Sequence, residues 1–461
     1  MSAEVKPTTT GAFQTTKAER NTYGLFFVGQ NFFYMLVVSF LQIFLTDKGV
    51  TAAAVAAVFV LVKVWDAVDD PLFGVIIDRS EPKSGKFLPW IRASIVPIAI
   101  TTVLMFAMPA SISLTAKIVW CAIAYILWDL TYTLCDAPVY ALMTAMTSNS
   151  QERTTMISIG RIGGMIGAIG VSLTIPLMYP KLGWLPTAII ISVIGLLTMI
   201  PVSRLAKERV HDKEEEAPSL GEIWANVKGN KYLLIFFGSM ILFSLTNTIM
   251  VASPYFAVNL LGKAEMASPI TAVTAFPMLL IAAFIPGLVK RFGKFKLYLF
   301  MTAWFIVSCF LTYFIGYSST PVLLLMFLVR GIGFGFVAVM LFMFAPDCVE
   351  YGTFKSGNRA AGVSFSMQSF AIKLTSGLSA SLAMFVLSLV HFVSGAGAVQ
   401  PATAIHGIWL LISIFPAFGA LLSIPVFLMY KLPEKDVEIM ARANNGEITR
   451  EEAVKQLSRT Y

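Results

Sequence analysis

The sequence has few charged residues and few residues that commonly bind metals or form disulfides. Of its 461 residues only 13% are charged, and it holds three histidines and four cysteines. Soluble globular chains have about 25% charged residues, so water is not the main solvent of this protein. The scarcity of cysteine argues against a disulfide framework.

The chain also lacks the short motifs of several enzyme classes. It has no zinc-binding motif, no Walker phosphate loop and no nucleophile elbow, which argues against an enzyme and against transport driven by nucleotide hydrolysis. No cofactor is expected. The polar stretch from Met1 to Arg20 has no apolar core like that of a secretory signal, so we expect the first apolar segment to remain as a membrane anchor.

Long apolar runs dominate the chain instead. Hydrophobic residues make up 57% of the sequence, in runs of roughly twenty or more, the length of helix that crosses a bilayer. They do not show the alternation typical of membrane β-barrels. The sequence therefore predicts an all-α membrane protein with twelve transmembrane helices. The predicted ranges are 22–46, 51–77, 91–109, 114–146, 155–178, 183–203, 232–255, 268–289, 297–316, 321–346, 361–391 and 404–430.

The positive charges are distributed unevenly along the chain. If both termini are cytoplasmic, the inner segments hold 26 of the 34 lysines and arginines, and the outer loops hold only Lys48, Lys117, Lys181 and Lys263. This bias follows the positive-inside rule. It predicts a multi-pass protein of the bacterial inner membrane with both termini in the cytoplasm. It also accounts for the net charge of +8 without a nucleic-acid partner.

A long polar connection divides the chain into two halves of six predicted spans. The expected parts are a cytoplasmic segment 1–21, an N-terminal six-helix bundle 22–203, a central loop 204–231, a C-terminal six-helix bundle 232–430 and a cytoplasmic tail 431–461. Each half has a short basic inner loop between its second and third spans, at 78–86 and 290–296. This parallel is typical of a transporter built from two repeats.

Nine ionisable residues fall inside the predicted spans and away from the span ends, where each costs several kcal/mol unless it is paired or hydrated. They are Asp66, Asp69, Asp70, Asp129, Asp136, Lys63, Arg161, Arg330 and Lys373. Helix rise places five of them and Asn31 roughly 9–18 Å from the inner ends of their spans. We expect acids and bases to pair in this layer and to line a polar cavity near the midplane.

The second predicted span carries three carboxylates close together. Lys63, Asp66 and Asp70 recur at i, i+3 and i+7 and share one stripe, with Asp69 beside them. Three carboxylates cannot all stay charged at low dielectric constant, so either a cation binds among them or one holds a proton. We interpret the group as a coupling-ion site. The alternative is a structural ion-pair cluster with Lys63.

The fourth predicted span combines carboxylates with aromatic rings. Asp129 and Asp136 share a face with Tyr132, and Tyr125 and Trp128 lie on the adjoining edge. Carboxylates accept hydrogen bonds from hydroxyl groups, and ring faces pack on the apolar face of a pyranose. The combination favours a sugar site, although the aromatic residues alone are more typical of core packing or an interfacial belt.

Five segments together resemble one family of transporters. They are YG at 23–24, KVWDAVDDPLFG at 63–74, GKFLPW at 85–90, YILWDLTYTLCDAP at 125–138 and DCVEYGTFK at 347–355. The chain resembles, over nearly its whole length, the glycoside-pentoside-hexuronide cation symporters of the major facilitator superfamily. The resemblance implies the major facilitator fold, with two six-helix bundles, and symport of a sugar with H+ or Na+ by alternating access.

The resemblance also implies roles for single residues. The implied cation site consists of Asp66, Asp69, Asp70 and Thr133, with Asp66 and Asp70 as metal ligands if the ion is Na+. The residues implied to contact or flank the sugar are Trp128, Tyr132, Asp136, Arg161, Gln368 and Lys373.

Three positions depart from the family pattern. Asn31 stands where a well-known member has a sugar-binding aspartate, and Gln30 replaces a lysine. Members with asparagine at the position of Asn31 resemble glucuronide and pentoside carriers more than galactoside carriers. Asp69 stands where many members have an uncharged residue. Asp129 replaces a glycine and adds a carboxylate near the predicted cavity. Asn31 and Asp129 therefore join the candidate sugar-binding residues.

The leading hypothesis is a monomeric symporter whose partners are a small sugar, a monovalent cation and membrane lipid. The alternative is a carrier of another solute class, such as a lysolipid, because distant relatives of this fold move lipids. A lipid carrier should have a broad apolar lateral opening, whereas the predicted midplane here is rich in carboxylates.

Overall fold

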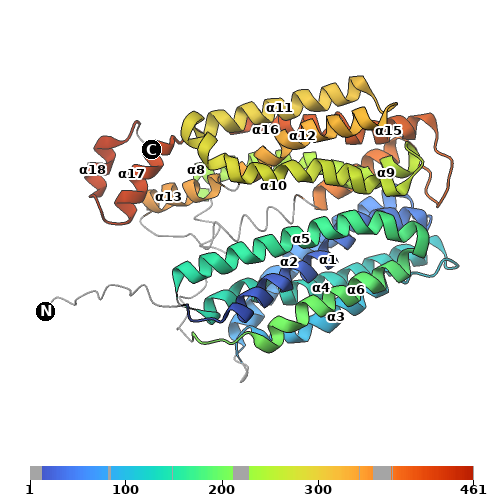
Figure 1. Ribbon diagram of the computed structural model, residues 1–461, viewed down its shortest axis with the longest axis horizontal. Helices are drawn as coiled ribbons and strands as arrows, with labels where there is room; N and C mark the ends of the chain where they lie inside the picture. Colours follow the sequence, from blue (N-terminus) through green and yellow to red (C-terminus); the bar gives the residue numbers. More distant parts are fainter. Residues whose placement is uncertain are drawn as a thin grey trace. The chain divides into compact units, whose positions relative to one another are not determined.

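The computed structural model describes residues 13–80, 85–147, 149–210, 228–341, 343–356, 375 and 377–459. Within these residues the regular elements are all helices (Figure 1). By length and composition, eight helical segments could cross a membrane, or nine if the bent pair near the C-terminus is one span. Each of the twelve predicted ranges contains a helix, the eleventh being represented by Gly377–Leu389.

The helices of the first half are long and continuous. They are α1 (Lys17–Asp47), α2 (Ala52–Arg79), α3 (Leu88–Phe106), α4 (Leu114–Met146), α5 (Ser150–Leu182) and α6 (Trp184–Leu205). Their lengths of 19 to 33 residues suit membrane spans.

The second half contains several broken spans. Its elements are α8 (Lys231–Phe243), η1 (Ser244–Asn247), α9 (Thr248–Asn259), η2 (Ala264–Met266), α10 (Ala267–Phe292), α11 (Lys294–Ile315), α12 (Thr320–Leu341), α13 (Phe344–Ser356), α15 (Ala402–Ile412), α16 (Phe415–Phe427), α17 (Glu434–Asn444) and α18 (Arg450–Gln456). The seventh predicted span is thus interrupted by a 3-10 turn, and the twelfth is bent by 43°.

The chain forms two compact units. The first comprises Met1–Val37 and Leu61–Lys213, and the second comprises Val38–Val60 and Glu214–Tyr461. The division after Lys213 falls inside the predicted central loop. The end of α1 and the start of α2 belong to the second unit, so these two helices contribute to both.

Within the first unit, α1 and α5 approach closely because α5 presents glycines to α1. A Cβ added at Gly163 would overlap the Gly24 carbonyl oxygen, and one added at Gly164 would lie 3.0 Å from the Asn31 amide nitrogen. α3 packs on α4 and α6, and the Arg92 guanidinium donates to the Ser203 carbonyl at 2.8 Å. These contacts fix the helices that carry the predicted site.

Two described features of the basic loops recur in both units. Gly85 and Gly293 have φ angles of +115° and +79°, which glycine adopts without strain. Glu208, after α6, accepts hydrogen bonds from the N–H groups at the start of α3, including Lys86 at 2.6 Å. Glu434, after α16, likewise accepts from the Lys294 N–H at the start of α11. Carboxylates at helix N-termini are stabilising, and their equivalent positions support the predicted repeat.

Candidate substrate and cation site

Three carboxylates meet inside the first unit. Asp66 and Asp69 on α2 and Asp129 on α4 each offer a carboxylate oxygen, and these oxygens lie within 4.8 Å of one another. All three residues are buried, with exposures of 7%, 1% and 4%. Carboxylate oxygens are good ligands for hard cations. The arrangement can therefore hold a small cation or share protons.

The ammonium group of Lys63 adds a positive charge beside this cluster. Its Nζ lies 2.8 Å from Asp66 Oδ2, one turn away on the same helix. The predicted i, i+3 stripe on α2 is thus formed, and it includes the ion pair that the alternative interpretation required. Asp129 comes from the facing helix, so the group is more than a pair along one helix.

Thr133 and Asp70 are the two other residues predicted for the cation site. Thr133 is buried on α4 one turn after Asp129, with an exposure of 2%. The backbone of Asp70 continues α2, but its side chain lies outside the described residues. The structure places Asp129, which the sequence analysis assigned to the sugar, with the acids of α2.

The predicted sugar-binding residues of α4 form a second group. Trp128 stacks on Tyr132 with ring centroids 5.1 Å apart, and Tyr34 of α1 lies 5.5 Å from Tyr132. The Trp128 indole N–H donates to the Thr102 hydroxyl on α3 at 3.0 Å, which fixes the ring. This bond commits the indole N–H to the scaffold, and Trp128 is only 2% exposed, so in this structure its ring supports Tyr132.

Asp136 is linked to the first helix. Its Oδ1 accepts a hydrogen bond from Gln30 Nε2 of α1 at 2.6 Å. Gln30 is buried and Asp136 is half-buried. A carboxylate held by an amide keeps acceptor sites for further hydrogen bonds, which is the property that recognition of hydroxyl groups requires.

Asn31 and Arg161 lie on the helices next to this group. The Asn31 amide donates to the Phe27 carbonyl at 3.0 Å and the residue is half-buried against the glycines of α5. The Arg161 side chain is exposed on α5. Gln368 and Lys373 lie outside the described residues.

The structure defines the partners of two of the predicted buried bases. Lys63 pairs with Asp66, as expected. Arg330 belongs to the second unit, and its Nη1 donates to a backbone carbonyl, that of Ile412, at 2.5 Å. Its charge is therefore used on a backbone carbonyl of the second unit.

Two contributors to the site were missed in the sequence. Gln30 was noted only as a departure from the family, and Tyr34 was not considered. Both lie one turn apart on α1 and flank Asn31, so helical spacing from Asn31 could have identified Tyr34.

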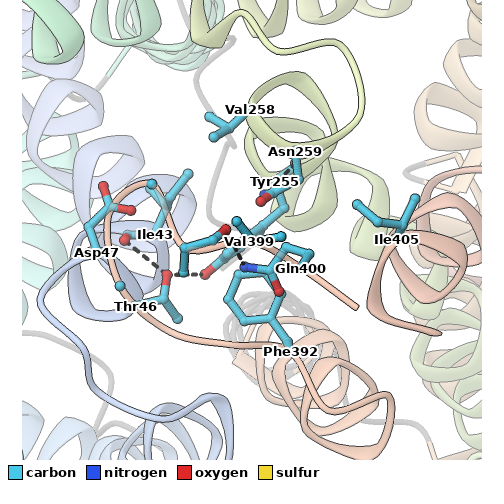
Figure 2. A pocket seen from close by; sticks show the side chains of 13 residues that line it. Ile43, Thr46, Asp47, Tyr255, Val258, Asn259, Phe392, Val399, Gln400 and Ile405 are labelled. Atoms are coloured by element: carbon cyan, nitrogen blue, oxygen red, sulfur yellow. Dashed lines mark hydrogen bonds between the residues drawn. The ribbon is translucent and has the colours of Figure 1, made fainter. Parts of the chain in front are cut away.

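The second unit contains a cavity that is a competing candidate site. It has a volume of about 400 Å³ and is lined by residues that include Thr46, Asp47, Tyr255, Phe392 and Gln400 (Figure 2). The Thr46 and Tyr255 hydroxyls are hydrogen-bonded at 3.1 Å, and the Gln400 amide bonds both backbone groups of Val393. These polar groups serve local structure, so the cavity is a poorer candidate than the first unit's cluster.

Similarity to known proteins places this chain in a family. A family profile described as MFS/sugar transport protein matches residues 22–434. The chain belongs to this family. It is similar to the isoprimeverose transporter of Lactiplantibacillus pentosus, with 28% identity over 460 residues covering 95% of each chain. It is also similar to the glucuronide carrier protein homolog of Escherichia coli (strain K12), with 26% identity over 457 residues covering 95% of this chain and 97% of the other.

The solved structures show the fold. The nucleoside transporter NupG matches with a TM-score of 0.65 and 16% identity, covering 90% of this chain and 100% of that one. The predicted major facilitator fold and the resemblance to sugar–cation symporters are confirmed, and the chain is a multi-pass membrane transporter of the sugar transport family.

Proposed function

We propose that this transporter takes up a glycoside, pentoside or hexuronide together with H+ or Na+ by alternating access. The observation that carries the proposal is that α4 contributes to two adjacent groups. Asp129 belongs to the carboxylate cluster, and Tyr132 and Asp136 belong to the proposed sugar group. One helix that contacts both ligands gives a direct physical route by which binding of one affects binding of the other.

Electrostatics support cation coupling. Three carboxylates whose oxygens lie within 4.8 Å repel one another strongly in a buried setting. A proton or Na+ bound among them relieves this repulsion. The energy for uptake is then supplied by the gradient of that ion, and no organic cofactor is required.

The second group supports a sugar as the transported solute. Aromatic ring faces and a carboxylate held by an amide lie together on α1 and α4, and both are suited to a ring that carries hydroxyl groups on one side. A lysolipid carrier is less compatible with this polar and acidic lining.

The location follows from charge distribution. Lysine and arginine are concentrated in the segments on one side of the helices, so we propose a bacterial inner-membrane protein with both termini cytoplasmic. The working unit is proposed to be a monomer in membrane lipid.

Uptake assays test the proposal. The purified protein in liposomes is offered a panel of labelled glycosides, pentosides and hexuronides, with sodium and pH gradients imposed separately. We expect accumulation of at least one of these sugars with one gradient and only equilibration without it. Failure of the whole panel, with accumulation of a labelled lysolipid instead, would overturn the proposal.

A further inference from the structure

Arg330 is a charged side chain deep in the second unit, apart from the site above. It lies on α12 with 0% exposure. The only acids between residues 232 and 430 are Glu265, Asp347 and Glu350. Asp347 pairs with Lys294 and Glu350 bonds Asn444, while Glu265 lies in the short helix η2. A buried cation needs compensation from some other source.

A backbone carbonyl and an aromatic ring supply part of that compensation, while Arg330 Nε and Nη2 have no hydrogen-bond partner in the part of the chain that the structure describes. Arg330 Nη1 donates to the Ile412 carbonyl at 2.5 Å, and its guanidinium lies 4.3 Å from the centroid of the Phe327 ring. Ile412 is the last residue of α15. The carbonyl end of a helix carries partial negative charge, so a cation there is favourable.

Pro416 explains why the Ile412 carbonyl is available. In a continuous helix this carbonyl would accept from the N–H of residue 416, but proline has no N–H and its ring clashes with the carbonyl four residues earlier. The helix accordingly stops at Ile412 and restarts at Phe415 with a 43° bend. The guanidinium replaces the donor that Pro416 removes.

The bend has a packing consequence. α15 packs on α9, whereas α16 packs on α8 and the 3-10 turn η1. Gly419, three residues after Pro416, lies so close to η1 that an added Cβ would be 2.8 Å from Leu245 Cβ. A straight span could not meet these neighbours at the same angles.

We propose that Arg330 is a positioning residue that fixes the bend in the last span by supplying the hydrogen bond missing at Pro416. Its charge serves the backbone and not the transported solute or ion. The bend in turn sets how the two halves of this span pack on α8, η1 and α9.

A double-mutant cycle tests the proposal. Arg330→Met should lower the melting temperature and reduce sugar uptake at least about tenfold, because it leaves a buried carbonyl without a donor. Pro416→Ala restores a backbone N–H, so Arg330→Met should have little effect in that background. Pro425→Ala, which removes a second proline from the same helix, is the matched control and should not rescue Arg330→Met.

The melting-temperature test is valid whether or not the proposed transport function is correct. The uptake test depends on that function. If Arg330→Met does not fold, recovery of a monodisperse protein in the Arg330→Met/Pro416→Ala variant supports the proposal. If Arg330→Met lowers the melting temperature and uptake equally in the wild type, in Pro416→Ala and in Pro425→Ala, the proposal is wrong. An unchanged melting temperature and uptake in Arg330→Met would also overturn it.

Discussion

At the scale of single residues, the acids of the first unit differ in what surrounds them. Asp66, Asp69 and Asp129 are buried together beside Lys63. Asp136 is half-buried and bonded to the Gln30 amide. The first environment suits an ion that neutralises charge, and the second suits hydroxyl groups that donate to a carboxylate.

Asp66→Asn should abolish accumulation of sugar against a gradient and spare exchange of labelled for unlabelled sugar. The substitution removes a charge from the cation cluster but no proposed hydroxyl contact. Asp70→Asn carries the same expectation from the sequence. Counterflow and gradient-driven uptake in liposomes separate the two activities, with Glu265→Gln in the short helix η2 as the control. Normal accumulation in Asp66→Asn contradicts the assignment.

Asp136→Asn should weaken sugar binding by about 10- to 100-fold, the usual effect of losing hydrogen bonds to a charged acceptor. Calorimetry with the sugar identified in the uptake panel measures the change. Thr101→Val, which removes the bond to Thr131 on the α3–α4 contact, is the control and should bind normally. An unchanged dissociation constant for Asp136→Asn would rule out its role.

The sequence identified most of the site residues, because charged groups inside apolar spans are costly and therefore conspicuous. It could not group them, since the grouping depends on how α4 is rotated against α1 and α2. Asp129 was assigned to the sugar on its spacing from Asp136, yet it lies with Asp66 and Asp69. The Gln30–Asp136 bond joins residues 106 positions apart, and no local pattern predicts it.

At the scale of elements, the start of α5 is tied to the N-terminal segment by Glu152. This buried carboxylate accepts hydrogen bonds from Gln14, Thr15 and Thr147 and pairs with Arg20 at 3.2 Å. Burial tends to raise the pKa of Glu152, but the hydrogen bonds from Thr147, Thr15 and Gln14 outweigh it and lower the pKa from 4.5 to about 2.

Glu152→Gln should therefore destabilise the protein by about 1–2 kcal/mol at pH 7. Because the folded pKa is below the unfolded pKa, the contribution of Glu152 is complete above about pH 4.5 and is lost as the pH falls toward 2. Melting temperatures of wild type and variant should converge over that range. Glu447→Gln, in an exposed ion pair with Arg442, should change little at any pH. A difference that does not depend on pH would contradict this account.

The sequence predicted the helices more readily than it predicted the breaks within them. Apolar runs predicted a helix in every expected range. The bend after Ile412 has a local cause in Pro416, which could have been read from the sequence. The 3-10 turn at Ser244–Asn247 contains no proline or glycine, and it reflects packing against α16 rather than local preference.

At the scale of the whole molecule, the two halves share a repeated structural feature but differ in their buried charged residues. Each half has a basic loop that contains a glycine with positive φ. The start of the helix after this loop is capped by a glutamate that follows the last span of the same half. The acids of the candidate site, however, all lie in the first unit. Arg330, a fully buried charge of the second unit, is bonded to the backbone. Among the residues that the structure describes, the first unit therefore holds the candidate groups for ion and sugar recognition.

The measurement that tests the central claim most directly is ion movement driven by sugar. Liposomes containing the protein, with no ion gradient, receive an inward gradient of the sugar found in the uptake panel, and internal pH and internal Na+ are followed with separate dyes. Coupling is reciprocal, so the account predicts that one of the two ions enters with the sugar, and that Asp66→Asn abolishes this entry while sugar still equilibrates. Sugar entry in the wild type without movement of either ion would contradict symport.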